Sequence, residues 1–119
     1  MTPITVQQKL FEARDQIHLI HLNTTSYAEH KALNAFYDSW LSLVDSFIET
    51  YQGKYGRIGG VAQITIDSIV NSRVYLINLM VFINEYAEPI VSEADSDLLN
   101  IIADMKGLIN ETLYLLTLK

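Results

Sequence analysis

The 119-residue sequence contains no cysteine. Disulfide bonds, thiolate zinc sites, iron–sulfur clusters and cysteine nucleophiles are therefore excluded, and nothing indicates an oxidising compartment. Lysine and arginine are scarce too, numbering eight against fourteen aspartates and glutamates, and they are scattered singly. Because phosphate binding needs clustered positive charge, these counts argue against a nucleic-acid-binding surface.

Long apolar runs are absent as well. The most apolar stretch, residues 74–83, is interrupted by Asn78, and it is only about half as long as the roughly 20 residues that a membrane-spanning helix needs. The first residues carry neither the basic segment nor the apolar core of a signal peptide. We therefore expect a cytoplasmic protein with no membrane partner.

What the chain does have is apolar surface to bury. Half of its residues are hydrophobic, 18% are charged, and the formal net charge is −6. This composition is typical of a folded domain rather than a disordered chain. At this length about two-thirds of the unfolded chain's surface can be buried. We expect a single domain spanning residues 1–119.

Apolar spacing predicts four helices, and helix-end signals place the first two. The first covers about residues 5–22, with Thr2 as its N-cap and Pro3 at its first position. The second begins at Ser26–Glu29, which has the spacing of a capping box, and extends to about Tyr51.

The other two helices follow a glycine-containing segment. Gly53–Gly60 matches neither the phosphate-binding nor the dinucleotide-binding pattern, and we interpret it as a turn. The third helix is predicted from about residue 61 or 64 to 86, and a second capping-box spacing at Ser92–Asp95 is predicted to open the fourth. Short connections within the first and last pairs favour an all-α, antiparallel four-helix bundle.

Helix bundles build metal sites from histidine, aspartate and glutamate on facing helices. His18 is predicted near the end of the first helix and His30 near the start of the second, so a hairpin brings both to one end of the bundle. Asp45 and Glu49 are four residues apart and project from one face of the second helix. We expect the remaining histidine, His21, on the surface.

A helix length decides how these four residues can meet. Fifteen residues separate His30 from Asp45, roughly 22 Å of helix at 1.5 Å per residue, so the four cannot ligate one metal within one subunit. An antiparallel pairing of two subunits about a two-fold axis makes two equal sites from them. Imidazole and carboxylate ligands with open positions suit Fe(II), with zinc or manganese as competitors.

The spacing of this quartet resembles the ferroxidase signature of the Dps-like miniferritins. The order His18, eleven residues, His30, fourteen residues, Asp45, three residues and Glu49 matches that signature in residue type and spacing. The segment between the histidines has the length of the family's own, with Tyr27 where the family has an aromatic residue. The last predicted helix is also similar to the family's fourth, so the resemblance covers most of the chain.

The resemblance implies a ferritin-like bundle that assembles into a hollow homo-oligomeric shell, usually a dodecamer. His18 and His30 of one subunit and Asp45 and Glu49 of its neighbour would bind iron at the dimer interface. The implied chemistry is oxidation of Fe(II), typically by hydrogen peroxide, with storage of the ferric product. The family's DNA binding is not expected here, because the chain lacks a basic tail.

The chain departs from the family pattern at three places. Asn34 stands where the family commonly has an acidic residue, which makes it a neutral and weaker ligand, and Leu19 stands where an aromatic residue usually follows the first histidine. The predicted connection between the second and third helices is about ten residues, too short for the family's small interface helix.

Two further questions stay open at the level of sequence. Four acidic residues could line a cation pore of a shell, or simply favour the start of the fourth helix; they are Glu93, Asp95, Asp97 and Asp104. The alternatives to a ferroxidase are a structural or interaction protein that keeps the bundle and its assembly without iron turnover, and a helical dimer with an incidental zinc site.

Overall fold

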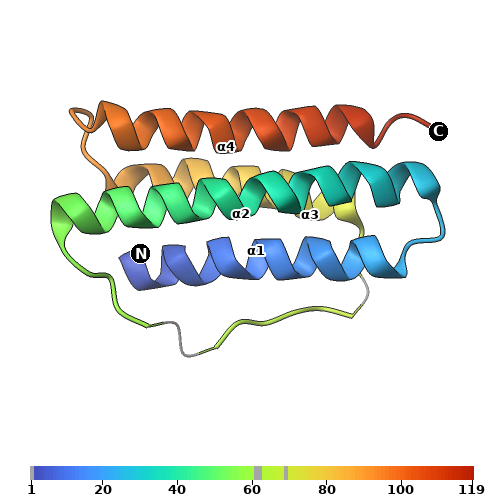
Figure 1. Ribbon diagram of the computed structural model, residues 1–119, viewed down its shortest axis with the longest axis horizontal. Coiled ribbons are helices and arrows are strands. Elements are labelled where there is room, and N and C mark those ends of the chain that lie inside the picture. Colours follow the sequence, from blue (N-terminus) through green and yellow to red (C-terminus); the bar gives the residue numbers. More distant parts are fainter. Residues whose placement is uncertain (1, 61–62, 69) are drawn as a thin grey trace.

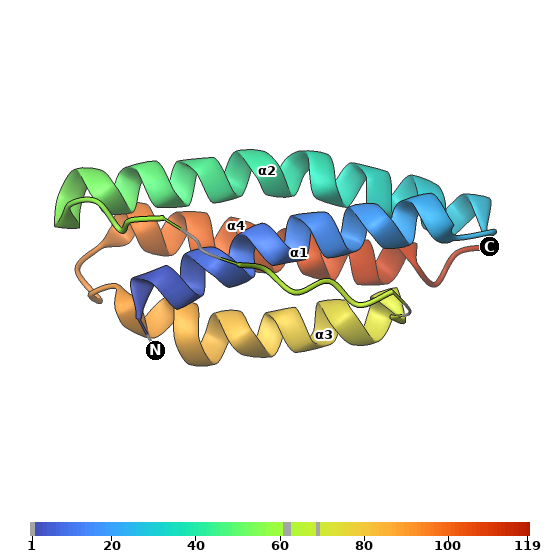
Figure 2. The same cartoon turned by 90° about the horizontal axis from the view of Figure 1, so that it is seen from below.

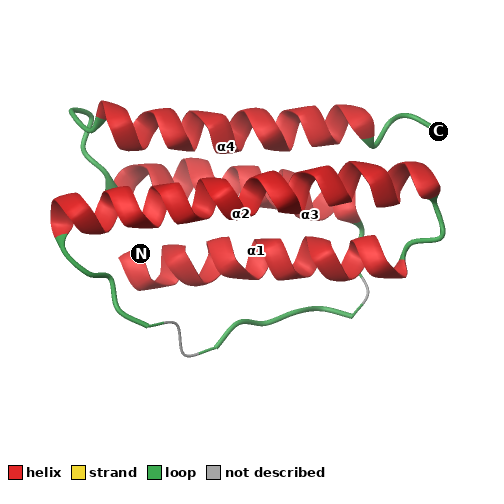
Figure 3. Cartoon of the chain, viewed as in Figure 1, coloured by secondary structure: helices red, strands yellow, loops and turns green. Residues whose placement is uncertain are grey.

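The computed structural model describes residues 2–60, 63–68 and 70–119, which form four α-helices packed as a bundle (Figure 1). The helices are α1 (Pro3–Asn23), α2 (Tyr27–Tyr55), α3 (Ser72–Phe82) and α4 (Ser96–Leu115). A π-helical turn, η1 (Ile83–Ala87), and a 3-10 turn, η2 (Glu88–Ile90), extend α3. Figure 3 shows helices and loops, with no strand in the described part of the chain.

The predicted starts of α1 and α2 are confirmed by their caps. The Thr2 side chain accepts a hydrogen bond from the Thr5 amide, and Pro3 is the first helical residue. The Ser26 hydroxyl accepts from the Glu29 amide at 3.2 Å. The capping box is only half formed, because the Glu29 carboxylate accepts from the Ser72 hydroxyl at 2.6 Å and thereby ties α2 to the start of α3.

The prediction for the start of the third helix was wrong. The earlier of the two predicted start positions, residue 61, lies outside the described residues. The described residues of 56–71 are not helical, and α3 begins only at Ser72. Side chains 63–67 alternate between exposed and half-buried, which is the two-residue period of an extended chain rather than the 3.6-residue period of a helix. Ile64, Thr65 and Ile66 are also β-branched, which disfavours helix.

The segment 56–71, called the crossover from here on, replaces the predicted turn at Gly53–Gly60. Gly53 belongs to α2, and the helix ends where Gly56 adopts a φ of 92°, which side chains rarely tolerate. The crossover then runs the length of the bundle and passes over α1 (Figures 1 and 2). Consequently α3 runs parallel to α2, while α1 and α4 run the other way (Figure 1).

Two buried glutamines of α1 fasten the crossover. Gln7 donates from its side-chain amide to the Gly59 carbonyl at 2.9 Å. Gln16 makes a pair of bonds with the backbone of Asp67, donating to its carbonyl at 3.0 Å and accepting from its amide at 2.8 Å. These bonds satisfy backbone groups that an extended segment cannot pair with itself.

The core lies between the four helices. Its largest fully buried side chain is Trp40, which stacks on Phe36 and donates from its indole nitrogen to the Leu10 carbonyl at 3.0 Å. This bond joins α2 to α1 in the middle of the bundle. None of the described helices is both long and apolar enough to cross a lipid bilayer.

Asp95 binds to the end of α2, whereas the histidines lie near its start. It is 1% exposed and accepts hydrogen bonds from Lys54, Tyr55 and the Ser92 amide. The bonds from Lys54 and Tyr55, in that order, are the main causes that lower the pKa of Asp95 to about 2. The same contacts raise the pKa of Lys54 and of Tyr55.

This arrangement corrects the interpretation of the second capping-box sequence. α4 begins at Ser96, four residues after Ser92, and Asp95 at its N-cap position makes no side-chain cap. The Asp95 carboxylate does accept from the Ser92 amide, as in a capping box, but it also accepts from Lys54 and Tyr55 of α2. A buried, fully bonded Asp95 is also unsuited to lining a pore. Asp97, another of the acidic residues considered for a cation pore, lies in the first turn of α4, where a negative charge is favourable.

Candidate functional site

The end of α1 and the start of α2 bring three histidines and a tyrosine together. The rings of His21 and His30 stack at 3.9 Å between centroids, and the His18 ring lies 5.9 Å from that of His21. The Tyr37 ring is 4.5 Å from His18 and 5.3 Å from His21. The short connection after Asn23 thus places His18 and His30 at one end of the bundle, as the sequence predicted.

The backbone determines which nitrogen of His30 carries its proton. The Nδ1 atom of His30 lies 3.0 Å from the carbonyl oxygen of His21. A carbonyl oxygen only accepts hydrogen bonds, so Nδ1 must be the protonated donor. In the neutral imidazole the free electron pair is therefore on Nε2, the nitrogen that can bind a metal ion.

His21 was predicted on the surface, and that prediction was wrong, because its side chain is only 6% exposed. Burial lowers the pKa of His21, and the imidazoles of His30 and His18 lower it further. Neither ring nitrogen of His21 has a hydrogen-bond partner among the described residues. A signal was present in the sequence: His21 follows the buried Ile17 by four residues and so continues the apolar stripe of α1.

The acidic pair lies elsewhere on α2. Asp45 and Glu49 are exposed, and Asn34 is half-buried one turn after His30. Within the part of the chain that the structure describes, no three histidine, aspartate or glutamate side chains are placed to share a metal ion. A metal site made from the two histidines and the two acids therefore requires a second subunit.

A groove of about 310 Å³ runs beside Asp45, where α1, α2 and the crossover meet. It is lined by Phe11, Arg14, Asp15, Leu41, Asp45 and Ile64. Phe11 and Leu41 are each 39% exposed, so this surface between the histidines and Glu49 is partly apolar. Arg14 contributes a positive charge to the same groove, and its Nε is buried without a hydrogen-bond partner in the described structure.

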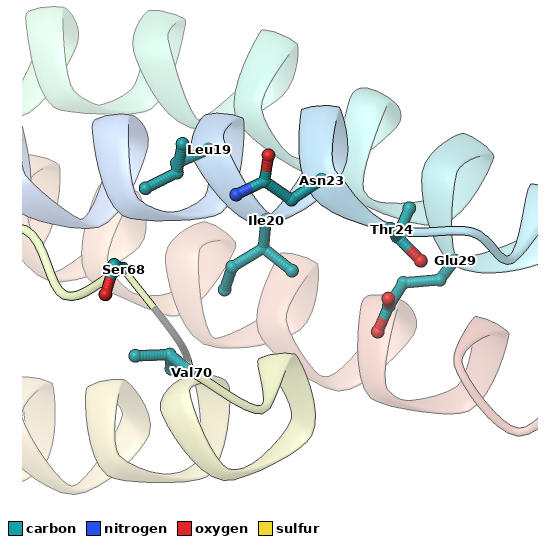
Figure 4. Close-up of a pocket in the computed structure, with 7 residues that line it drawn as sticks. All are labelled: Leu19, Ile20, Asn23, Thr24, Glu29, Ser68 and Val70. Carbon is teal, nitrogen blue, oxygen red and sulfur yellow. The ribbon is translucent and has the colours of Figure 1, made fainter.

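Figure 4 shows a second pocket, of about 330 Å³, between the end of α1, the start of α2 and the crossover. It is lined by Leu19, Ile20, Asn23, Thr24, Glu29, Ser68 and Val70. None of the predicted metal ligands lines it. The carboxylate of Glu29, which accepts a hydrogen bond from Ser72, is the ionisable group among these lining residues.

Comparison with known proteins adds relatives without a described activity. The model of a family described as "Family of unknown function (DUF5856)" matches residues 21–116. An uncharacterized 14.6 kDa protein from the mobD-ri intergenic region of Enterobacteria phage T4 is 28% identical over 115 residues, covering 92% of this chain and 84% of the phage protein. No solved structure matches the chain.

Proposed function

The chain belongs to DUF5856, a family of unknown function, and we propose from its geometry that it is a Dps-like iron-binding protein. In this proposal it oxidises Fe(II) at sites shared between two subunits and sequesters the ferric product inside a homo-oligomeric shell. Each site takes His18 and His30 from one subunit and Asp45 and Glu49 from the other, with Asn34 as a neutral neighbour.

The observation that carries the proposal is the placement of the two histidines. His18 and His30 come from different helices and lie at one end of the bundle, both in contact with the His21–Tyr37 cluster. Asp45 lies 15 residues after His30, or roughly 22 Å further along α2. A two-fold pairing with α2 antiparallel to its copy would bring the histidine end of one subunit to the acidic pair of the other.

The path of the chain also supports the proposal. Ferritin-like bundles differ from simple up-and-down bundles in having one long crossover connection. Here one long connection joins two parallel helices, α2 and α3, whereas the other helix pairs are joined by short segments (Figure 1). The crossover is also longer than the ten residues expected from the sequence, although its described residues form no helix.

The surface between the two half-sites suits a subunit interface. Phe11 and Leu41 are exposed there, and burying such side chains against a second copy would stabilise a dimer. Two imidazoles and two carboxylates form a donor set that accepts Fe(II), with zinc and manganese as competitors. Iron is the substrate, and its electrons pass to hydrogen peroxide or oxygen.

Growth of ferric absorbance after adding Fe(II) and peroxide to the metal-free protein tests this function. We expect the wild type to oxidise iron faster than buffer and Glu49→Ala to reduce the rate to that of buffer, because Glu49 is a principal carboxylate of the site. Glu111→Ala is the matched control, since it removes an exposed acid from α4 at a position outside the quartet. Wild-type oxidation no faster than buffer would refute the proposal.

The second candidate is a structural protein that keeps the bundle and its assembly without iron turnover. Arg14 favours it, because its guanidinium, which pairs with Asp15, adds a positive charge to the groove that Asp45 also lines and so opposes a metal cation there. Asn34 favours it too, since its amide adds no negative charge. Mass measurement in solution separates the readings: about twelve subunits support the shell, a dimer supports an incidental zinc site, and a ring or filament supports a structural role.

A further inference from the structure

We infer that His21 is a positioning residue that holds His30 in the one tautomer and ring orientation competent for metal binding. The inference deepens the proposed function and rests on it only for the identity of the bound ion. It concerns two side chains of one subunit, whose arrangement is defined by contacts within the described structure.

The first contact acts through the backbone. The His21 carbonyl accepts from Nδ1 of His30 at 3.0 Å, which leaves the Nε2 electron pair of His30 free. Histidines that bind metals commonly donate their other ring nitrogen to a carbonyl or carboxylate, and this second bond orients the ring. His21 therefore supplies to His30 the kind of support that a metal ligand requires.

The second contact acts through the side chain. The two rings stack at 3.9 Å with an angle of 21° between their planes, so the buried ring of His21 limits rotation of His30 about its own side-chain bonds. The stacked arrangement does not aim both rings at one point, which agrees with the absence of a three-ligand cluster among the described residues. We therefore assign His21 the role of a support and not that of a ligand.

The tautomer of His30 can be measured in the metal-free protein. Long-range proton–nitrogen spectra of the ¹⁵N-labelled chain at about pH 8, where imidazoles are mostly neutral, distinguish Nδ1–H from Nε2–H. We expect His30 to be the Nδ1–H form in the wild type and in His21→Phe, which keeps a stacked ring. His21→Ala keeps the backbone carbonyl that accepts from Nδ1, so we expect the same tautomer there. What this variant loses is the stacked ring that limits the orientation of His30. A wild-type His30 in the Nε2–H form would overturn the inference.

Metal titration supplies the second readout, with Co²⁺ as the probe. We expect the affinity to fall about 10- to 100-fold in His21→Ala and to stay close to the wild type in His21→Phe. Equal losses in both variants would show that His21 is itself a ligand, and equal affinities would show that its ring is not needed; either overturns the inference. Circular dichroism checks that both variants fold.

The two readouts also separate this inference from the proposed function. If the wild type binds no Co²⁺, the proposed iron site fails, while the tautomer spectra still decide whether His21 holds His30. If the wild type binds Co²⁺ and oxidises iron but His21→Ala does so equally well, the proposed function stands and the inference fails. Asn110→Ala, an exposed amide on α4, is the control for both measurements.

Discussion

Replacing Gln16 tests whether the crossover is held to α1 by side-chain hydrogen bonds. Gln16 is 1% exposed and makes two bonds with the backbone of Asp67, at 2.8 and 3.0 Å. Each such bond contributes roughly 0.5–1.5 kcal/mol net, so Gln16→Leu removes about 1–3 kcal/mol. Because Asp67 is exposed, water can satisfy its freed backbone groups, and we expect a loss of about 1–2 kcal/mol.

Urea denaturation measures this loss as a lower midpoint with an unchanged slope. Amide exchange provides a local readout, since the Asp67 amide should lose its protection in Gln16→Leu while amides in the middle of α2 keep theirs. A change in the free energy of unfolding below about 0.5 kcal/mol, together with unchanged protection at Asp67, would refute the reasoning.

Gln16→Glu is the sharper control because it keeps the size of the side chain and replaces only the amide nitrogen that donates the hydrogen bond. At neutral pH the introduced carboxylate can still accept from the Asp67 amide, but it faces the Asp67 carbonyl with no proton to donate. Burial and this repulsion raise the pKa of the introduced group above that of an exposed glutamate. The introduced glutamate therefore binds its proton more tightly in the folded than in the unfolded state. The stability of this variant should improve relative to the wild type as the pH falls from 7 towards 4.

Three further outcomes are expected. Trp40→Phe should cost about 1–3 kcal/mol in urea denaturation, because it loses both the bond to the Leu10 carbonyl and buried volume. Because the pKa of Asp95 is lowered to about 2, its contribution to stability is present above about pH 4 and is lost as the pH falls to 2. Thermal unfolding of Asp95→Asn should not show this loss of stability between about pH 4 and pH 2. Arg14→Gln should raise Co²⁺ affinity by removing a positive charge from the groove that Asp45 lines; unchanged affinity would show that this charge does not oppose the metal.

Local signals located much of the fold in advance. Thr2 and Pro3 at the start of α1 and Ser26 at the start of α2 act within one helical turn, and the structure has these caps where the sequence predicted them. The placement of His18 and His30 at one end followed from the short connection between the two helices. These features depend on neighbours in the chain, which a single sequence displays.

The errors arose where distant residues decide the outcome. The apolar residues after Gly60 suit a helix or an extended segment, and contacts with Gln7 and Gln16, about fifty residues away, select the extended path. At the second capping-box sequence, the Asp95 carboxylate accepts hydrogen bonds from Lys54 and Tyr55, which lie about forty residues earlier in the chain at the end of α2. Local preference was outweighed by tertiary contacts in both places.

The sequence by itself determined an all-helical fold, the approximate extent of α1, α2 and α4, and the spacing of His18, His30, Asp45 and Glu49. Only the tertiary structure decided the path of the crossover, the burial of His21 and the tautomer of His30. The physical reason is the range of the forces involved. Helix caps and apolar periodicity act over three or four residues, whereas burial and the pairing of buried polar groups depend on elements that meet only in the folded chain.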